Sequence, residues 1–105
     1  MPDDLQPTAA PRPAETAPHR VLVVDDSIDA ADMLSTWLRL HGHEVAVAHH
    51  GTEALALMPA FNPAVALLDL GMPDMSGYEL AERVRAAPDL RHVTLVAIKI
   101  GRAHV

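Results

Sequence analysis

Three aspartates follow two short apolar runs, and their chemistry and position indicate a metal site. Asp25 and Asp26 come directly after the run at 21–24. Asp69 follows the run at 64–68 and lies 43 residues after Asp26. Runs of this length, rich in Val and Leu, are typical of strands buried on both faces of a parallel sheet. Because such sheets bind ligands at the carboxyl ends of their strands, we predict that the three carboxylates converge there.

Three carboxylates in one partly desolvated pocket favour phosphoryl transfer at a bound cation. They repel one another strongly, so they stay ionised only beside a positive charge. Ligands that are all oxygen select a hard metal, and Mg²⁺ suits a site with few protein ligands because it keeps waters and shares phosphate oxygens. A carboxylate can also act as the nucleophile and form an aspartyl phosphate.

The elements between the acidic sites predict an α/β fold. An amphipathic segment at 28–41 predicts a helix, the apolar stretch at 44–48 a strand, and 51–58 a second helix. Pro59 lacks a backbone donor, so we expect that helix to end near residue 58. Alternating strands and helices with right-handed crossovers give a parallel sheet.

Local signals mark the helix ends. Ser27 can cap the first helix, and Gly42 can supply a left-handed C-terminal cap. Ser76 and Glu79 form a capping box that begins a third helix. The predicted buried stripe of the first helix consists of Leu34 and Leu38 with Ala30, Met33 and Trp37.

The acidic residues and their surroundings resemble the receiver domain of two-component response regulators. That family carries an acidic pair followed by D-x-x-M-P-x-M-x-G, and residues 69–77 read Asp-Leu-Gly-Met-Pro-Asp-Met-Ser-Gly. The resemblance covers about residues 20–98, and the segments 27–31 and 40–45 resemble receivers attached to hybrid sensor kinases. It implies a flavodoxin-like, doubly wound parallel sheet with strand order 2-1-3-4, in which the family's fifth strand and fifth helix are missing.

The resemblance also implies a role for each site residue. Asp69 corresponds to the phosphoacceptor, Asp26 to a direct Mg²⁺ ligand and Asp25 to a ligand through water. Gly71 corresponds to the residue that gives its backbone carbonyl to the metal. A histidine kinase or histidine phosphotransfer domain would donate the phosphoryl group, and the protein would be a cytoplasmic signalling phosphoacceptor rather than an enzyme. Asp74 is interpreted as a turn residue, and the remaining motif residues as structural or loop-packing: Met72, Pro73, Met75 and Gly77.

The sequence departs from the family near its C-terminus. Thirty residues after Asp69, where the family has Ser or Thr, this sequence has Lys99, the only lysine among eight basic residues. The family's later lysine, aromatic residue and final helix do not follow before Val105. We interpret residues 99–105 as a non-native tail and residues 20–98 as a truncated receiver, and we expect the 105-residue chain to be unstable and unable to switch.

Composition sets further limits. A chain of 105 residues holds one domain, and residues 1–19, rich in Pro and Ala, predict a disordered linker. A net charge of −6 argues against direct contact with nucleic acid. The chain has no cysteine, which fits the reducing cytoplasm, and no apolar run of transmembrane length, so we expect no direct membrane contact.

Two other functions remain open besides the phosphoacceptor. One is a receiver-like fragment or interaction module that does not switch. The other is a Mg²⁺-dependent aspartyl phosphatase, which normally has a second Asp two residues after its nucleophile; Gly71 at that position disfavours it. A zinc site is also disfavoured, because the histidines near the first helix end and the following loop lack a tetrahedral ligand set: His41, His43, His49 and His50.

Overall fold

The structure is a computed structural model that describes residues 18–98. Its elements are β1 (Arg20–Val24), α2 (Ile28–Leu40), β2 (Glu44–Ala48), α3 (Gly51–Phe61), β3 (Val65–Asp69), α4 (Gly77–Ala86), the 3-10 helix η2 (Pro88–Leu90) and β4 (Thr94–Ile98). Nearly all of the predicted linker at 1–19 and all of the predicted tail at 99–105 lie outside the described residues.

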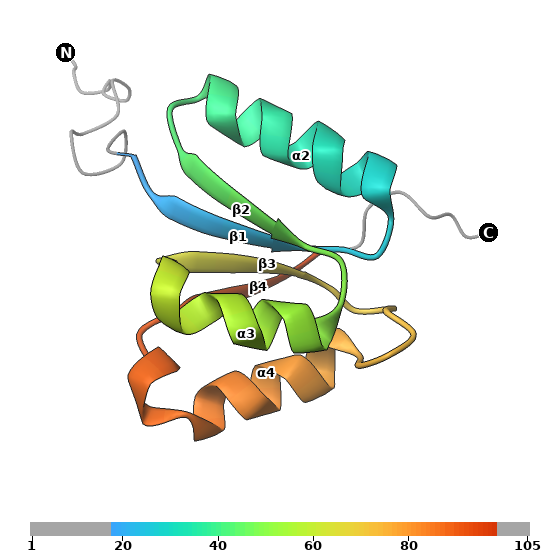
Figure 1. Cartoon of the computed structure of the whole chain (residues 1–105), viewed down its shortest axis with the longest axis vertical. Coiled ribbons are helices and arrows are strands. Elements are labelled where there is room, and N and C mark those ends of the chain that lie inside the picture. The colour runs from blue at the N-terminus through green and yellow to red at the C-terminus, as the bar shows by residue number, and fades with distance from the viewer. Residues whose placement is uncertain (1–17, 99–105) are drawn as a thin grey trace, which may run out of the picture.

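The four strands form one parallel sheet in the order β2-β1-β3-β4. Figure 1 shows α2 on one side of this sheet and α3 and α4 on the other. The predicted α/β, flavodoxin-like architecture with strand order 2-1-3-4 is therefore confirmed. None of the helices within residues 18–98 has the length and apolar character needed to cross a membrane.

Strand β1 is buried on both faces, as its continuous apolar run predicted. Leu22 and Val24 belong to the core cluster that includes Met58 of α3. Val21 and Val23 point to the other face and pack with residues of α2. All four apolar residues of β1 are 5% exposed or less. The strand that leads into Asp25 is therefore fixed from both sides.

Strand β4 forms an edge of the described sheet and is much more exposed than β1. Thr94, Val96 and Ala97 are exposed, and Val96 lies opposite Leu67 of β3. Beside β3, a groove of about 210 Å³ opens next to α2 and is lined mainly by apolar side chains: His19, Val21, Leu38, His43, Val65 and Leu67. On the side of the sheet that faces α2, β3 and β4 are therefore less completely covered by the described residues than β1 is.

Both predicted caps of α2 are confirmed. The Ser27 hydroxyl accepts a hydrogen bond from the Ala30 amide at 3.2 Å. At the other end Gly42 has a φ of +91°, a conformation that costs glycine little because it has no Cβ. The next amide, that of His43, then donates to the Leu38 carbonyl at 3.1 Å. This is the arrangement of a Schellman cap.

The buried face of α2 differs from the predicted one. Its buried residues are Ala31, Ser35 and the predicted Leu38, and the predicted Leu34 is partly buried against the same cluster. Met33 and Trp37, in contrast, are 73% and 54% exposed. Both sets repeat at helical spacing, so periodicity alone could not choose between them. The smaller residues face the sheet, which lets the helix backbone lie close to the strands. The prediction that Met33 and Trp37 belong to the buried stripe is wrong.

Helix α3 is longer than predicted. It ends at Phe61 rather than at Met58, with Pro59 inside the helix. The missing Pro59 amide removes one hydrogen bond near the end of the helix, where little helix remains to be disrupted. Asn62 then takes a left-handed conformation with φ of 53° and donates its amide to the Met58 carbonyl at 2.8 Å. This terminal bond closes the helix beyond the proline.

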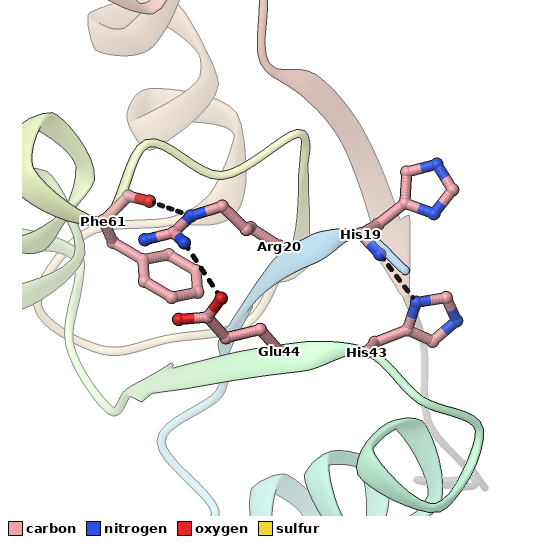
Figure 2. Close-up of polar contacts among 5 residues, drawn as sticks. All are labelled: His19, Arg20, His43, Glu44 and Phe61. Atoms are coloured by element: carbon pink, nitrogen blue, oxygen red, sulfur yellow. Dashed lines mark hydrogen bonds and ion pairs between the residues drawn. The ribbon is translucent and has the colours of Figure 1, made fainter. Parts of the chain in front are cut away.

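Polar contacts join the elements at the N-terminal ends of β1 and β2 (Figure 2). The Arg20 guanidinium donates to the Phe61 carbonyl at 2.6 Å and pairs with Glu44 at 2.9 Å. It also lies 4.7 Å from the centre of the Phe61 ring. The His19 amide donates to the His43 ring Nδ1 at 3.0 Å. Since the strands are parallel, these contacts lie at the N-terminal ends of the strands, and the aspartates lie at the C-terminal ends.

Candidate metal centre

The three predicted aspartates converge at the C-terminal ends of the strands. Asp25 directly follows β1, and Asp69 is the last residue of β3, which pairs with β1. One carboxylate oxygen from each of Asp25, Asp26 and Asp69 lies within 4.8 Å of the others. Within residues 18–98, no other group of three or more His, Cys, Asp or Glu side chains is close enough together to hold a metal ion. The described histidines belong to no such group.

Burial differs among the three carboxylates. Asp25 is 1% exposed and Asp69 is 7% exposed, whereas Asp26 is exposed. Ionised carboxylates at such short range repel each other, by roughly 3 kcal/mol for a pair about 5 Å apart at an effective dielectric constant of about 20. A divalent cation offsets this repulsion, and the exposed side at Asp26 leaves room for its waters. The all-oxygen donor set therefore fits Mg²⁺.

Short backbone turns hold the two buried carboxylates. The Asp25 carboxylate accepts the Ser27 amide at 2.9 Å, and the Asp69 carboxylate accepts the Gly71 amide at 3.0 Å. In both cases the donor lies two residues further along the chain, as in an Asx turn. The turn after Asp69 brings the Gly71 amide to its carboxylate.

The loop after Asp69 is attached to the start of α3. The Asp74 carboxylate accepts a hydrogen bond from the Gly51 amide, whose nitrogen lies 3.2 Å from Oδ2 and 3.4 Å from Oδ1. His50, at the N-cap position of α3, makes no side-chain cap of its own. Met72 and Met75 are buried in the same core, as the predicted loop packing required. Asp74 is therefore more than a turn residue, because its carboxylate caps a helix 23 residues earlier in the chain.

Helix α4 begins against the backbone of Asp69. One half of the predicted capping box is present, since the Ser76 hydroxyl accepts the Glu79 amide at 3.1 Å. The Glu79 carboxylate pairs with Arg83 at 3.0 Å. A Cβ added to Gly77 would lie 2.9 Å from the Asp69 carbonyl oxygen and 3.1 Å from the Leu70 Cα. Only a residue without a side chain fits this approach. The structure thus gives a physical reason for the glycine that ends the motif.

We expect Gly77→Ala to lower the free energy of unfolding by about 1–3 kcal/mol, because an added methyl would displace backbone atoms. Gly71→Ala is the matched control, since its Cβ would have only the Asp69 Oδ1 nearby, at 3.8 Å. Urea denaturation followed by circular dichroism compares the two variants. Equal midpoints for both would show that the backbone beside Asp69 yields to the added methyl.

Comparisons with known proteins agree with this geometry. The chain matches the family model of the response regulator receiver domain over residues 21–102. It is 40% identical over 72 residues to the transcriptional regulatory protein TrcR of Mycobacterium tuberculosis, covering 69% of this chain and 28% of that protein. It is 39% identical over 83 residues to the DNA-binding response regulator MtrA of Mycobacterium bovis, covering 79% of this chain and 36% of that protein. The chain therefore spans about a third of these relatives.

Solved structures show the same fold. The N-terminal domain of a response regulator receiver protein from Methanoculleus marisnigri has a TM-score of 0.76 at 31% identity, covering 82% of this chain and 70% of that one. The chemotaxis protein CheY4 of Vibrio cholerae has a TM-score of 0.73 at 36% identity, and the match covers 77% of this chain and 68% of CheY4. Because the family match includes all three aspartates and nearly the whole sheet, this chain belongs to the family of response regulator receiver domains.

Proposed function

We propose that this receiver accepts a phosphoryl group on Asp69 in a Mg²⁺-dependent reaction. The convergence of Asp25, Asp26 and Asp69 within 4.8 Å at the carboxyl edge of the sheet carries the proposal. We propose a histidine kinase or a histidine phosphotransfer domain as the donor, which agrees with membership of the receiver family. Receiver domains are signalling modules, so the net reaction would move a phosphoryl group onto the protein itself.

Each site residue would have a separate role in this transfer. An oxygen of the Asp69 carboxylate would attack phosphorus as the bond from phosphorus to the donor's imidazole nitrogen breaks. The Gly71 amide, 3.0 Å from Asp69 Oδ1, orients that carboxylate. Asp69 is only 7% exposed, so the phosphoryl group would arrive from the open side, near the exposed Asp26. Mg²⁺ would supply positive charge that offsets the charge gathering in the pocket.

The metal would be held mainly from the exposed side. Asp26 is the proposed direct ligand, with Asp69 and the Gly71 carbonyl on the β3 side. Asp25 is buried and its carboxylate already accepts the Ser27 amide, which supports a role through a bridging water. An aspartyl phosphatase is less well supported, because position 71, where its second Asp would stand, is glycine.

The similar proteins do not share one output. The relatives include DNA-binding response regulators and the receiver domain of a signal transduction histidine kinase from Syntrophus aciditrophicus, which is 28% identical with a TM-score of 0.73. The likeness thus identifies the receiver module rather than one output. We propose that the module acts in the cytoplasm and makes no nucleic-acid contact itself, which its net charge of −6 supports.

Treatment of a version extended to full length with acetyl phosphate tests the proposal, because the 105-residue chain by itself is expected to be unstable. This extended version is the original chain with which the variants below are compared. We expect intact-protein mass spectrometry to show the addition of one phosphoryl group in the presence of Mg²⁺ and little addition when EDTA removes the metal. Circular dichroism of both samples checks that the fold is the same. Equal modification with and without Mg²⁺ would contradict a metal-dependent site.

A further inference from the structure

The end of β2 holds the backbone of Asp25 through two successive residues. The Asp25 amide donates to the Ala48 carbonyl at 3.0 Å, which extends the pairing of β1 with β2 by one bond. The ring Nδ1 of His49 lies 2.9 Å from the Asp25 carbonyl oxygen. Both backbone polar groups of Asp25 are therefore engaged by β2 and the residue that follows it.

The contact fixes the tautomer of His49. A carbonyl oxygen can only accept a hydrogen bond, so the Nδ1 atom of His49 must carry the proton and donate it. The backbone of His49 is anchored as well, because its amide donates to the Glu53 carboxylate in the first turn of α3 at 2.9 Å. The half-buried imidazole is thus a donor on a residue whose backbone is held by α3.

This donor acts on the peptide that joins Asp25 to Asp26. The peptide unit is planar, so the direction of the Asp25 carbonyl also sets the direction of the following N–Cα bond. Asp26 is exposed, and the position of its carboxylate therefore depends strongly on its backbone. Rotation of this peptide would change the direction of the Asp26 side chain relative to Asp69.

We propose that His49 is a positioning residue for the metal centre. Its Nδ1–H holds the Asp25 carbonyl and so directs Asp26 toward a Mg²⁺ ion shared with Asp69. The proposal rests on the proposed Mg²⁺ site and adds a residue outside the aspartate motif. Hydrogen bonds that orient metal ligands from outside the coordination sphere commonly change metal affinity by tenfold or more.

Three variants separate this role from general packing. His49→Asn keeps an N–H donor attached at Cγ, the same branch point as Nδ1, whereas His49→Phe keeps a ring and removes the donor. His50→Ala is the matched control, because His50 is the exposed neighbour and makes no side-chain cap bond. Isothermal titration calorimetry gives the Mg²⁺ dissociation constant of each variant, and urea denaturation gives its stability.

We expect His49→Phe to weaken Mg²⁺ binding about tenfold, while His49→Asn and His50→Ala stay within about twofold of the original chain. A purely structural role would instead lower the stability of both His49 variants and would not be rescued by asparagine. Mg²⁺ binding by folded His49→Phe equal to that of the original chain would overturn the proposal.

A second measurement needs neither metal nor a variant. Long-range ¹H–¹⁵N correlation spectra of the metal-free chain should show His49 with its proton on Nδ1. A proton on Nε2 alone would overturn the proposal even if His49→Phe failed to fold. Absence of Mg²⁺ binding by the original chain, with the Nδ1–H tautomer present, would instead count against the proposed metal-dependent function.

Discussion

Asp69→Asn is expected to take up no phosphoryl group from acetyl phosphate, whereas the original chain takes up one. The asparagine amide keeps the shape of the side chain and an oxygen for the Gly71 amide, but it lacks the anionic oxygen that attacks phosphorus. Asp25 cannot easily replace it, because that residue is 1% exposed and its carboxylate is bonded to the Ser27 amide. Intact-protein mass spectrometry measures the loss.

The matched control is Asp74→Asn. Asp74 lies in the same loop, but its carboxylate accepts the Gly51 amide at the start of α3 and asparagine retains an oxygen for that bond. We expect this variant to be modified like the original chain. An adduct of equal yield on Asp69→Asn would refute the assignment of Asp69 as the phosphoacceptor.

The second large effect concerns the two neighbouring aspartates. Asp26→Asn should weaken Mg²⁺ binding by about tenfold or more, because it removes the charge of a direct ligand. Asp25→Asn should weaken binding by only about two- to threefold, because Asp25 is proposed to act through a water. The asparagine oxygen at position 25 can still accept the Ser27 amide, so that turn is kept. Calorimetric titration with MgCl₂ compares the two dissociation constants.

Stability measurements separate a change in Mg²⁺ affinity from a loss of folded protein. Both variants are examined by urea denaturation without metal, so that a loss of folded protein is not mistaken for a loss of affinity. Equal reductions in Mg²⁺ affinity in two equally folded variants would contradict the different roles proposed for Asp25 and Asp26.

The strands and the meeting of the aspartates could be predicted from local sequence. The run at 21–24 is apolar throughout, which is typical of a strand buried on both faces, and β1 is buried on both. In a parallel sheet the carboxyl ends of all strands lie at one edge, so aspartates that end two adjacent strands come together. The strand order was predicted from the family resemblance, and the pairing of β1 with both β2 and β3 confirms it.

The orientation of α2 and the end of α3 depended on packing that periodicity does not contain. Residues 31, 35 and 38 repeat at helical spacing just as 33 and 37 do, and contact with the sheet buries the first set. Of the predicted stripe, Leu34 and Leu38 do pack against the sheet. Pro59 was expected to end α3, but the left-handed Asn62 closes the helix beyond it. In both cases the tertiary arrangement overrode a local preference.

Contacts of Asp74 and His49 could not be predicted from sequence spacing. Asp74 caps a helix that begins 23 residues before it, and His49 contacts a carbonyl 24 residues before it. No periodic pattern connects such positions, and they become neighbours only after the strands pair. One available signal was that His50 is not a favoured N-cap residue, which leaves the first amides of α3 open to a cap from elsewhere.

The position of the acyl phosphate tests the central claim most directly. After acetyl phosphate treatment in the presence of Mg²⁺, borohydride reduction converts an aspartyl phosphate to homoserine, and tandem mass spectrometry of peptides locates the changed residue. We predict homoserine at position 69 and unchanged aspartate at positions 25, 26 and 74. Homoserine at one of those other positions, with unchanged Asp69, would contradict the account.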